Sequence, residues 1–138
     1  MLTRCLGCMK LYDSENGICP RCGYTAETPV EKPFYLSPGT ILQNRYLVGK
    51  ALRSDAATIS YIGWDQKEEH RVEVTEFYRS DLCARGEGSP AVETRVGIEA
   101  AVFEDAKNSF LEKYQQKHRD SEVVFEENRV RTSTILGV

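Results

Sequence analysis

Residues 46–77, YLVGKALRSDAATISYIGWDQKEEHRVEVTEF, contain three strand-like segments in a chain of 138 residues. Segments 46–52 and 58–64 are apolar, β-branched and aromatic, and polar residues separate them at 53–55. Residues 71–77 alternate apolar and polar side chains with the period of two that a half-buried strand has. Three consecutive antiparallel strands are the simplest interpretation of this pattern.

The residues after this region predict one helix and two more strands. Segments 122–126 and 130–136 are strand candidates. Segment 99–118 carries apolar side chains at spacings of three and four, as one face of a helix does: Val102, Phe103, Ala106, Phe110, Leu111 and Tyr114. The predicted order is therefore β-β-β-α-β-β, which is an α+β domain.

Two Cys-x-x-Cys pairs precede the predicted sheet. Cys5 and Cys8 form the first pair, Cys19 and Cys22 form the second, and ten residues separate them. Each pair lets two thiolates converge from one tight turn, and two such turns supply the tetrahedral sulfur site that Zn²⁺ prefers. We therefore predict a zinc ribbon over residues 1–24. Four thiolates leave no open coordination position, so the metal is structural and not hydrolytic.

Two other interpretations of these cysteines have less support in the sequence. Disulfides would suit a secreted fragment, but no apolar signal core follows Met1. A thioredoxin-type redox pair would need a strand-turn-helix setting, which neither pair has. Zinc binding remains the prediction, and a ribbon of this size needs the metal for its stability.

Residues 25–38 carry three prolines and show neither helical nor strand periodicity. This composition is typical of a linker. Phe34 and Tyr35 are expected to hold its distal end against the domain that follows. Because a linker of this length limits shared contacts, we expect chelation to unfold the ribbon and to leave residues 39–138 largely folded.

The overall composition narrows the function classes. Eighteen Lys and Arg residues oppose twenty-one Asp and Glu residues, and the formal net charge of −3 argues against nucleic acid as a partner. Apolar residues make up 41% of the chain, which argues against wholesale disorder. No run reaches the roughly 18 apolar residues that a membrane span needs. We therefore expect a cytoplasmic protein without a membrane segment.

Four motifs resemble the N-terminal lobe of bacterial serine/threonine protein kinases that begin with a zinc ribbon. They are LSPGTIL at 36–42, RYLVGKAL at 45–52, YIGWD at 61–65 and EFY at 76–78. The resemblance implies a kinase N-lobe-like domain over residues 39–138, with a five-stranded antiparallel sheet and one helix, the regulatory helix C. It also implies that the chain ends about where the hinge to a C-lobe would begin.

The phosphate-binding turn of that family is altered in this chain. A kinase places Gly-x-Gly-x-x-Gly between its first two strands, so that the backbone lies over the ATP phosphates. The matching residues are RSDAAT at 53–58, with Arg53, Asp55 and Thr58 in place of the glycines. The carboxylate of Asp55 would oppose the triphosphate, so we expect no ATP binding.

The ion pair that positions ATP in kinases is also missing. The third strand of the family carries Val-Ala-Ile-Lys, and its Lys pairs with a Glu on helix C. This chain reads VEVT at 72–75, so Thr75 stands at the Lys position and Glu73 shares its strand face. In the helix, FLEKY at 110–114 places Lys113 where the family has the pairing Glu.

These changes predict a non-catalytic, pseudokinase-like interaction or regulatory module whose cofactor is structural zinc. One alternative is an N-lobe fragment of a serine/threonine kinase in which Lys113 reaches the phosphates. Another is a nucleic-acid-binding zinc ribbon joined to an unrelated β domain, which the net charge argues against. The expected partner is another protein, the remainder of a longer chain or a second copy, because a lone N-lobe leaves apolar surface uncovered. If the chain is complete, self-association is expected near Val102, Phe103, Phe110 and Ile135, whereas in a fragment the missing C-lobe would cover this surface.

Overall fold

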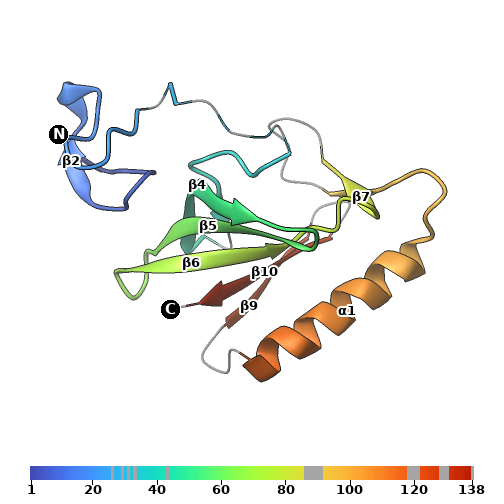
Figure 1. The fold of residues 1–138 in the computed structure, drawn as a ribbon. Coiled ribbons are helices and arrows are strands. Elements are labelled where there is room, and N and C mark those ends of the chain that lie inside the picture. The colour runs from blue at the N-terminus through green and yellow to red at the C-terminus, as the bar shows by residue number, and fades with distance from the viewer. Residues whose placement is uncertain are drawn as a thin grey trace.

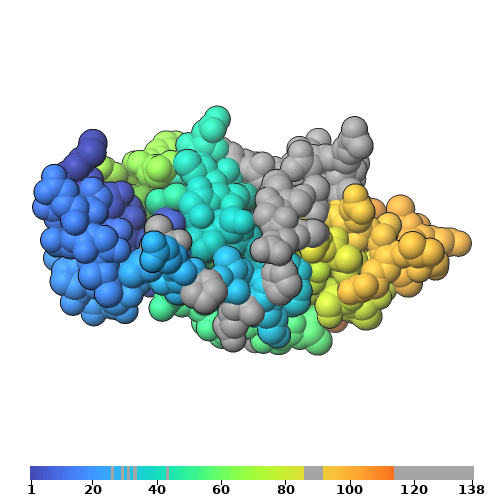
Figure 2. Space-filling view, turned by 90° about the horizontal axis from the view of Figure 1, so that it is seen from above, coloured from blue at the N-terminus to red at the C-terminus, as the bar shows by residue number. Residues whose placement is uncertain are grey.

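The structure, a computed structural model, describes these residues, with side chains up to Lys113: 1–25, 27–28, 30, 32, 34–42, 44–85, 92–117, 122–127 and 131–137. The ribbon contains three short elements: β1 (Leu2–Arg4), β2 (Leu11–Asp13) and the 3-10 helix η1 (Ser14–Asn16). The body contains nine elements (Figure 1): β3 (Ile41–Leu42), β4 (Tyr46–Ser54), β5 (Thr58–Asp65), β6 (His70–Phe77), β7 (Cys83–Ala84), β8 (Glu93–Thr94), α1 (Ala100–Lys117), β9 (Glu122–Glu127) and β10 (Arg131–Gly137). Figure 2 shows the ribbon at one end of the molecule and α1 at the other, with the sheet region between them.

The main sheet has six strands in the order β3-β4-β5-β6-β10-β9, and each neighbouring pair is antiparallel. The predicted count of five is wrong by one strand, because β3 pairs with the start of β4 at the edge of the sheet. Two residues are too few to show the alternation that reveals a strand in sequence. The mixed composition, mostly sheet with one α-helix among the described residues, agrees with the predicted class.

The register of the sheet assigns alternate side chains to two faces. Tyr61 lies opposite Val74, and Ile62 lies opposite Glu73, so these two pairs point to opposite sides. Val48 joins the face of Tyr61 through the β4–β5 register. Tyr61, Val74 and Val48 are completely buried and belong to one apolar cluster. The face of Tyr61 therefore carries the centre of the core.

Helix α1 packs against the other face of the sheet, where Phe77 lies (Figure 1). The rings of Phe103 and Phe110 have centroids 5.6 and 5.2 Å from that of Phe77. Both rings therefore contact the sheet, and self-association near these two residues stays a prediction. Val102 is exposed, and the side chain of Ile135 lies outside the described set. Among the described residues, no helix has the length and hydropathy that crossing a bilayer requires.

Aromatic side chains attach the distal end of the linker to the body. Phe34 stacks on Tyr78, with ring centroids 5.0 Å apart and ring planes 6° apart. Tyr35 packs edge-on against Tyr61 at 6.3 Å, and its hydroxyl shares a 2.8 Å hydrogen bond with Ser54 Oγ. The expectation that Phe34 and Tyr35 hold this end of the linker is confirmed.

Candidate metal centre and the sheet surface beside it

The four predicted ligands, Cys5, Cys8, Cys19 and Cys22, converge on one point. Their sulfur atoms all lie within 4.8 Å of one another. Cys5 Sγ is 3.5 Å from Cys22 Sγ, and Cys8 Sγ is 3.8 Å from Cys19 Sγ. A tetrahedral zinc with bonds of about 2.3 Å separates its sulfurs by roughly 3.8 Å. All four thiols are free, so the cluster fits a tetrahedral metal ion and zinc in particular.

Two backbone turns of the same form build this site. We call residues 5–10 the first knuckle and residues 19–24 the second knuckle. In each, the carbonyl of the first cysteine accepts a hydrogen bond from the N–H four residues later, that of Met9 at 2.7 Å and that of Gly23 at 2.9 Å. In each, the N–H of the first cysteine donates to the carbonyl five residues later, at 2.9 and 3.0 Å. Met9 and Gly23 therefore occupy equivalent positions.

Both positions have a left-handed backbone, with φ of 63° at Met9 and 78° at Gly23. Glycine adopts this conformation without steric cost, which is why the sequence indicates a turn at Gly23. Methionine does not, and no sequence pattern marked Met9 as a special residue. The side chain of Met9 is 1% exposed, so its burial offsets the strain of its backbone.

Burial and hydrogen bonds shift the pKa values of Cys5 and Cys19 in opposite directions. Burial raises the pKa of the Cys5 thiol to about 12. Burial also opposes ionisation of Cys19, but hydrogen bonds from the backbone of Cys22 and Arg21 outweigh it and lower the pKa of Cys19 to about 6. Four thiolates this close repel one another. Complete ionisation of the cluster therefore requires a bound cation.

Met9 is buried against Gly49 of β4. A Cβ atom at Gly49 would lie 2.6 Å from Met9 Cε and 2.2 Å from the backbone oxygen of Leu6. The same oxygen accepts a 2.9 Å hydrogen bond from the backbone N–H of Lys50. The first knuckle thus lies directly on β4 at Gly49, because only glycine, which has no side chain, leaves room for it there.

A second contact joins the ribbon to the sheet at β5. The guanidinium carbon of Arg4 lies 3.6 Å from the ring centroid of Trp64, which is close enough for a cation–π interaction. Together with the knuckle contact, this packing contradicts the expectation that the linker limits shared contacts between ribbon and sheet.

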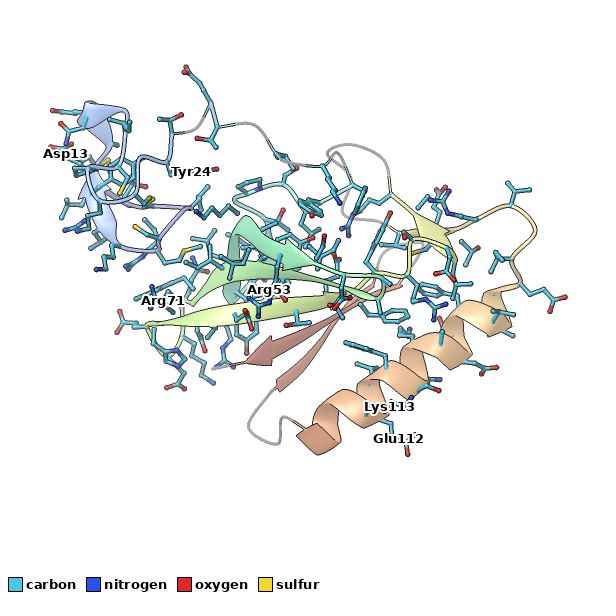
Figure 3. The ribbon with its side chains drawn as sticks, in the orientation of Figure 1. Asp13, Tyr24, Arg53, Arg71, Glu112 and Lys113 are labelled. Carbon is cyan, nitrogen blue, oxygen red and sulfur yellow. The ribbon has the colours of Figure 1, made fainter. Side chains whose placement is uncertain are left out.

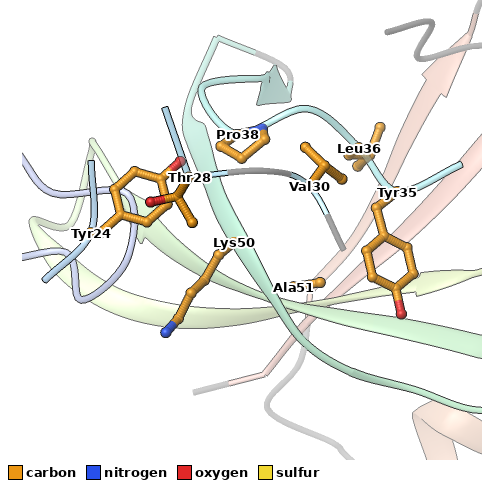
Figure 4. Close-up of a pocket in the computed structure, with 8 residues that line it drawn as sticks. All are labelled: Tyr24, Thr28, Val30, Tyr35, Leu36, Pro38, Lys50 and Ala51. Atoms are coloured by element: carbon orange, nitrogen blue, oxygen red, sulfur yellow. The ribbon is translucent and has the colours of Figure 1, made fainter. Parts of the chain in front are cut away.

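A cavity of about 270 Å³ lies where the ribbon, the linker and β4 meet. Figure 4 shows Tyr24 and Thr28 at one end of it and Tyr35 and Leu36 at the other. Its lining is mostly apolar, and one residue of it is charged: Tyr24, Thr28, Val30, Tyr35, Leu36, Pro38, Lys50 and Ala51.

The residues that the resemblance would place at an ATP site form local contacts of their own. Arg53 and Glu73 form an ion pair on the face of the sheet opposite to Tyr61. Asp55 accepts hydrogen bonds from the backbone N–H groups of Ala57 and Thr58, at 2.9 and 2.8 Å. The Ala57 bond is the main reason that the pKa of Asp55 is lowered. Asp55 therefore closes the turn between β4 and β5.

Thr75 and Lys113, which the resemblance places at the Lys and Glu of the kinase ion pair, lie in different environments. Thr75 is buried in β6, whereas Lys113 is exposed on α1 (Figure 3). Among the described side chains of α1, Lys107 is a buried cation, and its ammonium lies 3.0 Å from Glu104 Oε2. The periodicity of the helix could have pointed to Lys107, because it follows Phe103 by four residues on the buried face.

A buried ion pair that sequence reasoning missed joins β6 to the linker. Arg85 donates to both carboxylate oxygens of Glu76, at 2.7 and 2.8 Å, and neither side chain is exposed. The hydroxyl of Tyr61 donates to Glu76 Oε1 at 3.0 Å. Arg85 Nε donates to the carbonyl of Phe34 at 2.8 Å, and the N–H of Leu36 donates to the Tyr61 hydroxyl at 3.1 Å. The network therefore fixes the linker on the core face of the sheet.

One signal for this network was present in the sequence. Glu76 continues the alternation of Val72 and Val74, so a carboxylate falls in the buried phase of the strand. A buried carboxylate needs a cationic partner. Burial opposes the charge of Arg85, but the Glu76 carboxylate keeps the pKa of Arg85 above its ordinary value.

Comparisons with protein-family models, with curated proteins and with solved structures find no match to this chain.

Proposed function

We propose that this chain is a non-catalytic, kinase-like interaction or regulatory module that carries a structural zinc ribbon. The motifs at 36–42, 45–52, 61–65 and 76–78 support the kinase-like part. An antiparallel sheet with the one described α-helix packed on one face is compatible with it. The four converging thiols support the zinc ribbon.

The ion pair between Arg53 and Glu73 is the observation that carries the non-catalytic part. It lies on the strand face where the resemblance would place the ATP phosphates. Glu73 adds a negative charge there, and Arg53 is already engaged with it. Thr75, which stands at the position of the phosphate-binding Lys, offers no cation. A triphosphate would meet a neutralised cation and a carboxylate instead of a preorganised positive site.

The exposed position of Lys113 gives no support to the alternative in which this residue reaches the phosphates. The nucleic-acid alternative would need a basic surface. The ribbon has a net charge of about +1 from Arg4, Lys10 and Arg21 against Asp13 and Glu15, which is far below what phosphate contacts of useful affinity require.

Thermal unfolding of the zinc-loaded chain with and without ATP and Mg²⁺ tests the proposal. A dissociation constant near 0.1 mM would stabilise the fold by roughly 1.4 kcal/mol at about 1 mM nucleotide, which shifts a melt by several degrees. We expect no shift. A reproducible shift that Lys113→Ala abolishes would establish the alternative with a relocated lysine, and the same shift lost in Arg53→Ala would place the nucleotide on β4.

Zinc content is measured on the same sample. We expect one equivalent, bound by Cys5, Cys8, Cys19 and Cys22. A metal-free protein with full stability would contradict the zinc part and would leave the result on ATP binding unaffected.

A further inference from the structure

We propose that the four-cysteine centre is a peroxide-sensitive modification site. In this proposal, oxidation forms the disulfides Cys5–Cys22 and Cys8–Cys19, releases the metal and loosens the ribbon from the sheet. The inference rests on the zinc ribbon of the proposed function and adds the chemistry to which that ribbon responds.

We base the pairing on two contacts that link the knuckles, within a cluster whose four sulfurs all lie within 4.8 Å of one another. Cys5 Sγ and Cys22 Sγ are 3.5 Å apart, and Cys8 Sγ and Cys19 Sγ are 3.8 Å apart. A disulfide bond measures about 2.05 Å, so each pair must close by less than about 2 Å. Both pairs link the first knuckle to the second, which distinguishes this outcome from disulfides within each Cys-x-x-Cys.

Each pair also combines one accessible thiol with one buried thiol. Cys22 is exposed and Cys8 is half-buried, whereas Cys5 and Cys19 are each 1% exposed. A peroxide molecule can therefore meet Cys22 and Cys8 first. The buried partner of each lies beside it and is placed to attack the oxidised sulfur.

The chemistry balances with hydrogen peroxide as the oxidant. The accessible thiolate attacks one peroxide oxygen, the O–O bond breaks, and a sulfenic acid and hydroxide form. The buried thiolate then attacks the sulfenic sulfur, an S–S bond forms and a second hydroxide leaves. Each pair gives two electrons to one peroxide, and two protons convert the hydroxides to water. Disulfide sulfurs no longer carry the negative charge that holds Zn²⁺, so the ion dissociates.

The change reaches the sheet because the contact residues belong to the first knuckle itself. Leu6 lies between the two ligands of that knuckle and accepts the hydrogen bond of Lys50 N. Met9 follows Cys8 directly and fills the space over Gly49. Replacing metal bonds by S–S bonds shortens the sulfur separations, and in this proposal the shift disturbs the close contact of Leu6 and Met9 with Gly49.

The chain contains its own reporter and its own control for this process. Trp64 is the single tryptophan, and it lies under Arg4 of the ribbon. Cys83, the fifth cysteine, is 0% exposed, and its thiol donates to Arg79 O at 3.0 Å. Burial raises the pKa of Cys83 to about 11. Cys83 is thus a thiol that peroxide should not reach.

The test treats the reduced, zinc-loaded full chain with excess hydrogen peroxide. Zinc release is followed with a chromogenic chelator, the disulfides are mapped by mass spectrometry without reduction, and Trp64 emission is recorded in parallel. We expect release of the full equivalent of zinc, the two cross-knuckle disulfides and a change in Trp64 emission. Reductant with added zinc should reverse all three, and Cys83→Ser should behave as the parent chain does.

A second variant isolates the contact with the sheet. Arg4→Ala should alter Trp64 emission in the reduced, zinc-loaded state without releasing zinc, and peroxide should then change its emission less than in the parent. Zinc retained under excess peroxide, or disulfides within each Cys-x-x-Cys, would overturn the proposed site. Zinc release with unchanged Trp64 emission would overturn the coupling to the sheet. A reduced protein that binds no zinc would instead refute the ribbon of the proposed function, and this inference with it.

Discussion

The ribbon and the main sheet differ in how much apolar surface they bury. Within residues 1–24 the buried apolar side chains are Cys5, Met9 and Cys19, and two of these are expected metal ligands. The body buries a continuous cluster around Tyr61 and Val74. A segment the size of the ribbon cannot support itself by burial, whereas the body has a core of its own. The dependence should therefore run one way: the ribbon needs the metal and the sheet, and the sheet needs neither for its basic fold.

Metal removal should produce the largest effect and tests this asymmetry directly. Chelation, or Cys19→Ser, should unfold the ribbon, because the metal contributes about 10–16 kcal/mol of apparent binding energy in comparable peptides. The body should stay folded with a lower urea midpoint, because it loses the contacts at Gly49 and Trp64. Hydrogen exchange should lose protection over 1–24 and keep it over 46–77. A single transition that removes both would show that the two regions fold as one unit.

Damage to the buried network should destabilise the body first and, because the ribbon rests on the body, the ribbon as well. Arg85→Ala leaves the buried Glu76 carboxylate without its partner, and breaking such a pair costs about 3–5 kcal/mol. The matched control is Arg79→Ala, because Arg79 pairs with Asp81 on the surface, where an ion pair contributes at most about 1 kcal/mol. Urea unfolding of the zinc-loaded proteins measures the difference. Equal losses in the two variants would mean that the buried network adds nothing beyond a surface pair.

A smaller effect should come from the boundary between the regions. Gly49→Ala places a methyl group 2.2 Å from the backbone oxygen of Leu6, and overpacking of this kind costs about 1–3 kcal/mol. The ribbon should move away from β4 while it keeps its zinc, so Trp64 emission should change and zinc content should not. Met9→Ala removes the other neighbour of this site, and a double-mutant cycle should show coupling between the two positions. If the effects of Gly49→Ala and Met9→Ala simply add, the two residues are not in contact, and the placement of the ribbon on β4 would be contradicted.

The smallest effect concerns the turn after β5 and depends on pH. Arg45 donates to both carboxylate oxygens of Asp65, at 2.9 and 2.7 Å, and these bonds hold the pKa of Asp65 well below its ordinary value. A lowered pKa in the folded state means that the stabilisation is complete above the unfolded value of about 3.9 and is lost as the pH falls below it. Asp65→Asn should cost about 1–3 kcal/mol at pH 7. The difference in urea midpoint between variant and parent should begin to shrink as the pH falls below about 4, and a difference that does not change with pH would refute the assignment.

The regular parts of the molecule could be predicted because their signals are short-range. The spacing of Cys5, Cys8, Cys19 and Cys22 reflects turns of a few residues, and the alternation in 71–77 reflects one strand. β3 was missed because two residues carry no period. The contacts of Phe103 and Phe110 with Phe77 were not predicted, because an apolar stripe indicates burial but does not say which side chains cover it.

The contacts between the ribbon and the sheet could not be predicted for a different reason. Met9 has a backbone that its residue type disfavours, and only the space above Gly49 explains why it is there. Arg85 and Glu76 are nine residues apart in sequence, yet the network that they form closes on Phe34, which is 51 residues from Arg85. Sequence periodicity carries no information at that separation.

The sequence alone indicates the four cysteines that could hold a metal and the order of the longer strands and the helix, since each depends on neighbours within a few residues. The tertiary structure alone decides that the ribbon lies on β4 and β5, that the linker is fixed by Arg85, and that Arg53 pairs with Glu73. These features depend on which segments meet across the sheet, and that is set by the balance of packing over the whole chain. Gly49, Arg85 and Met9 therefore have their structural roles only because the tertiary packing places their contact partners beside them.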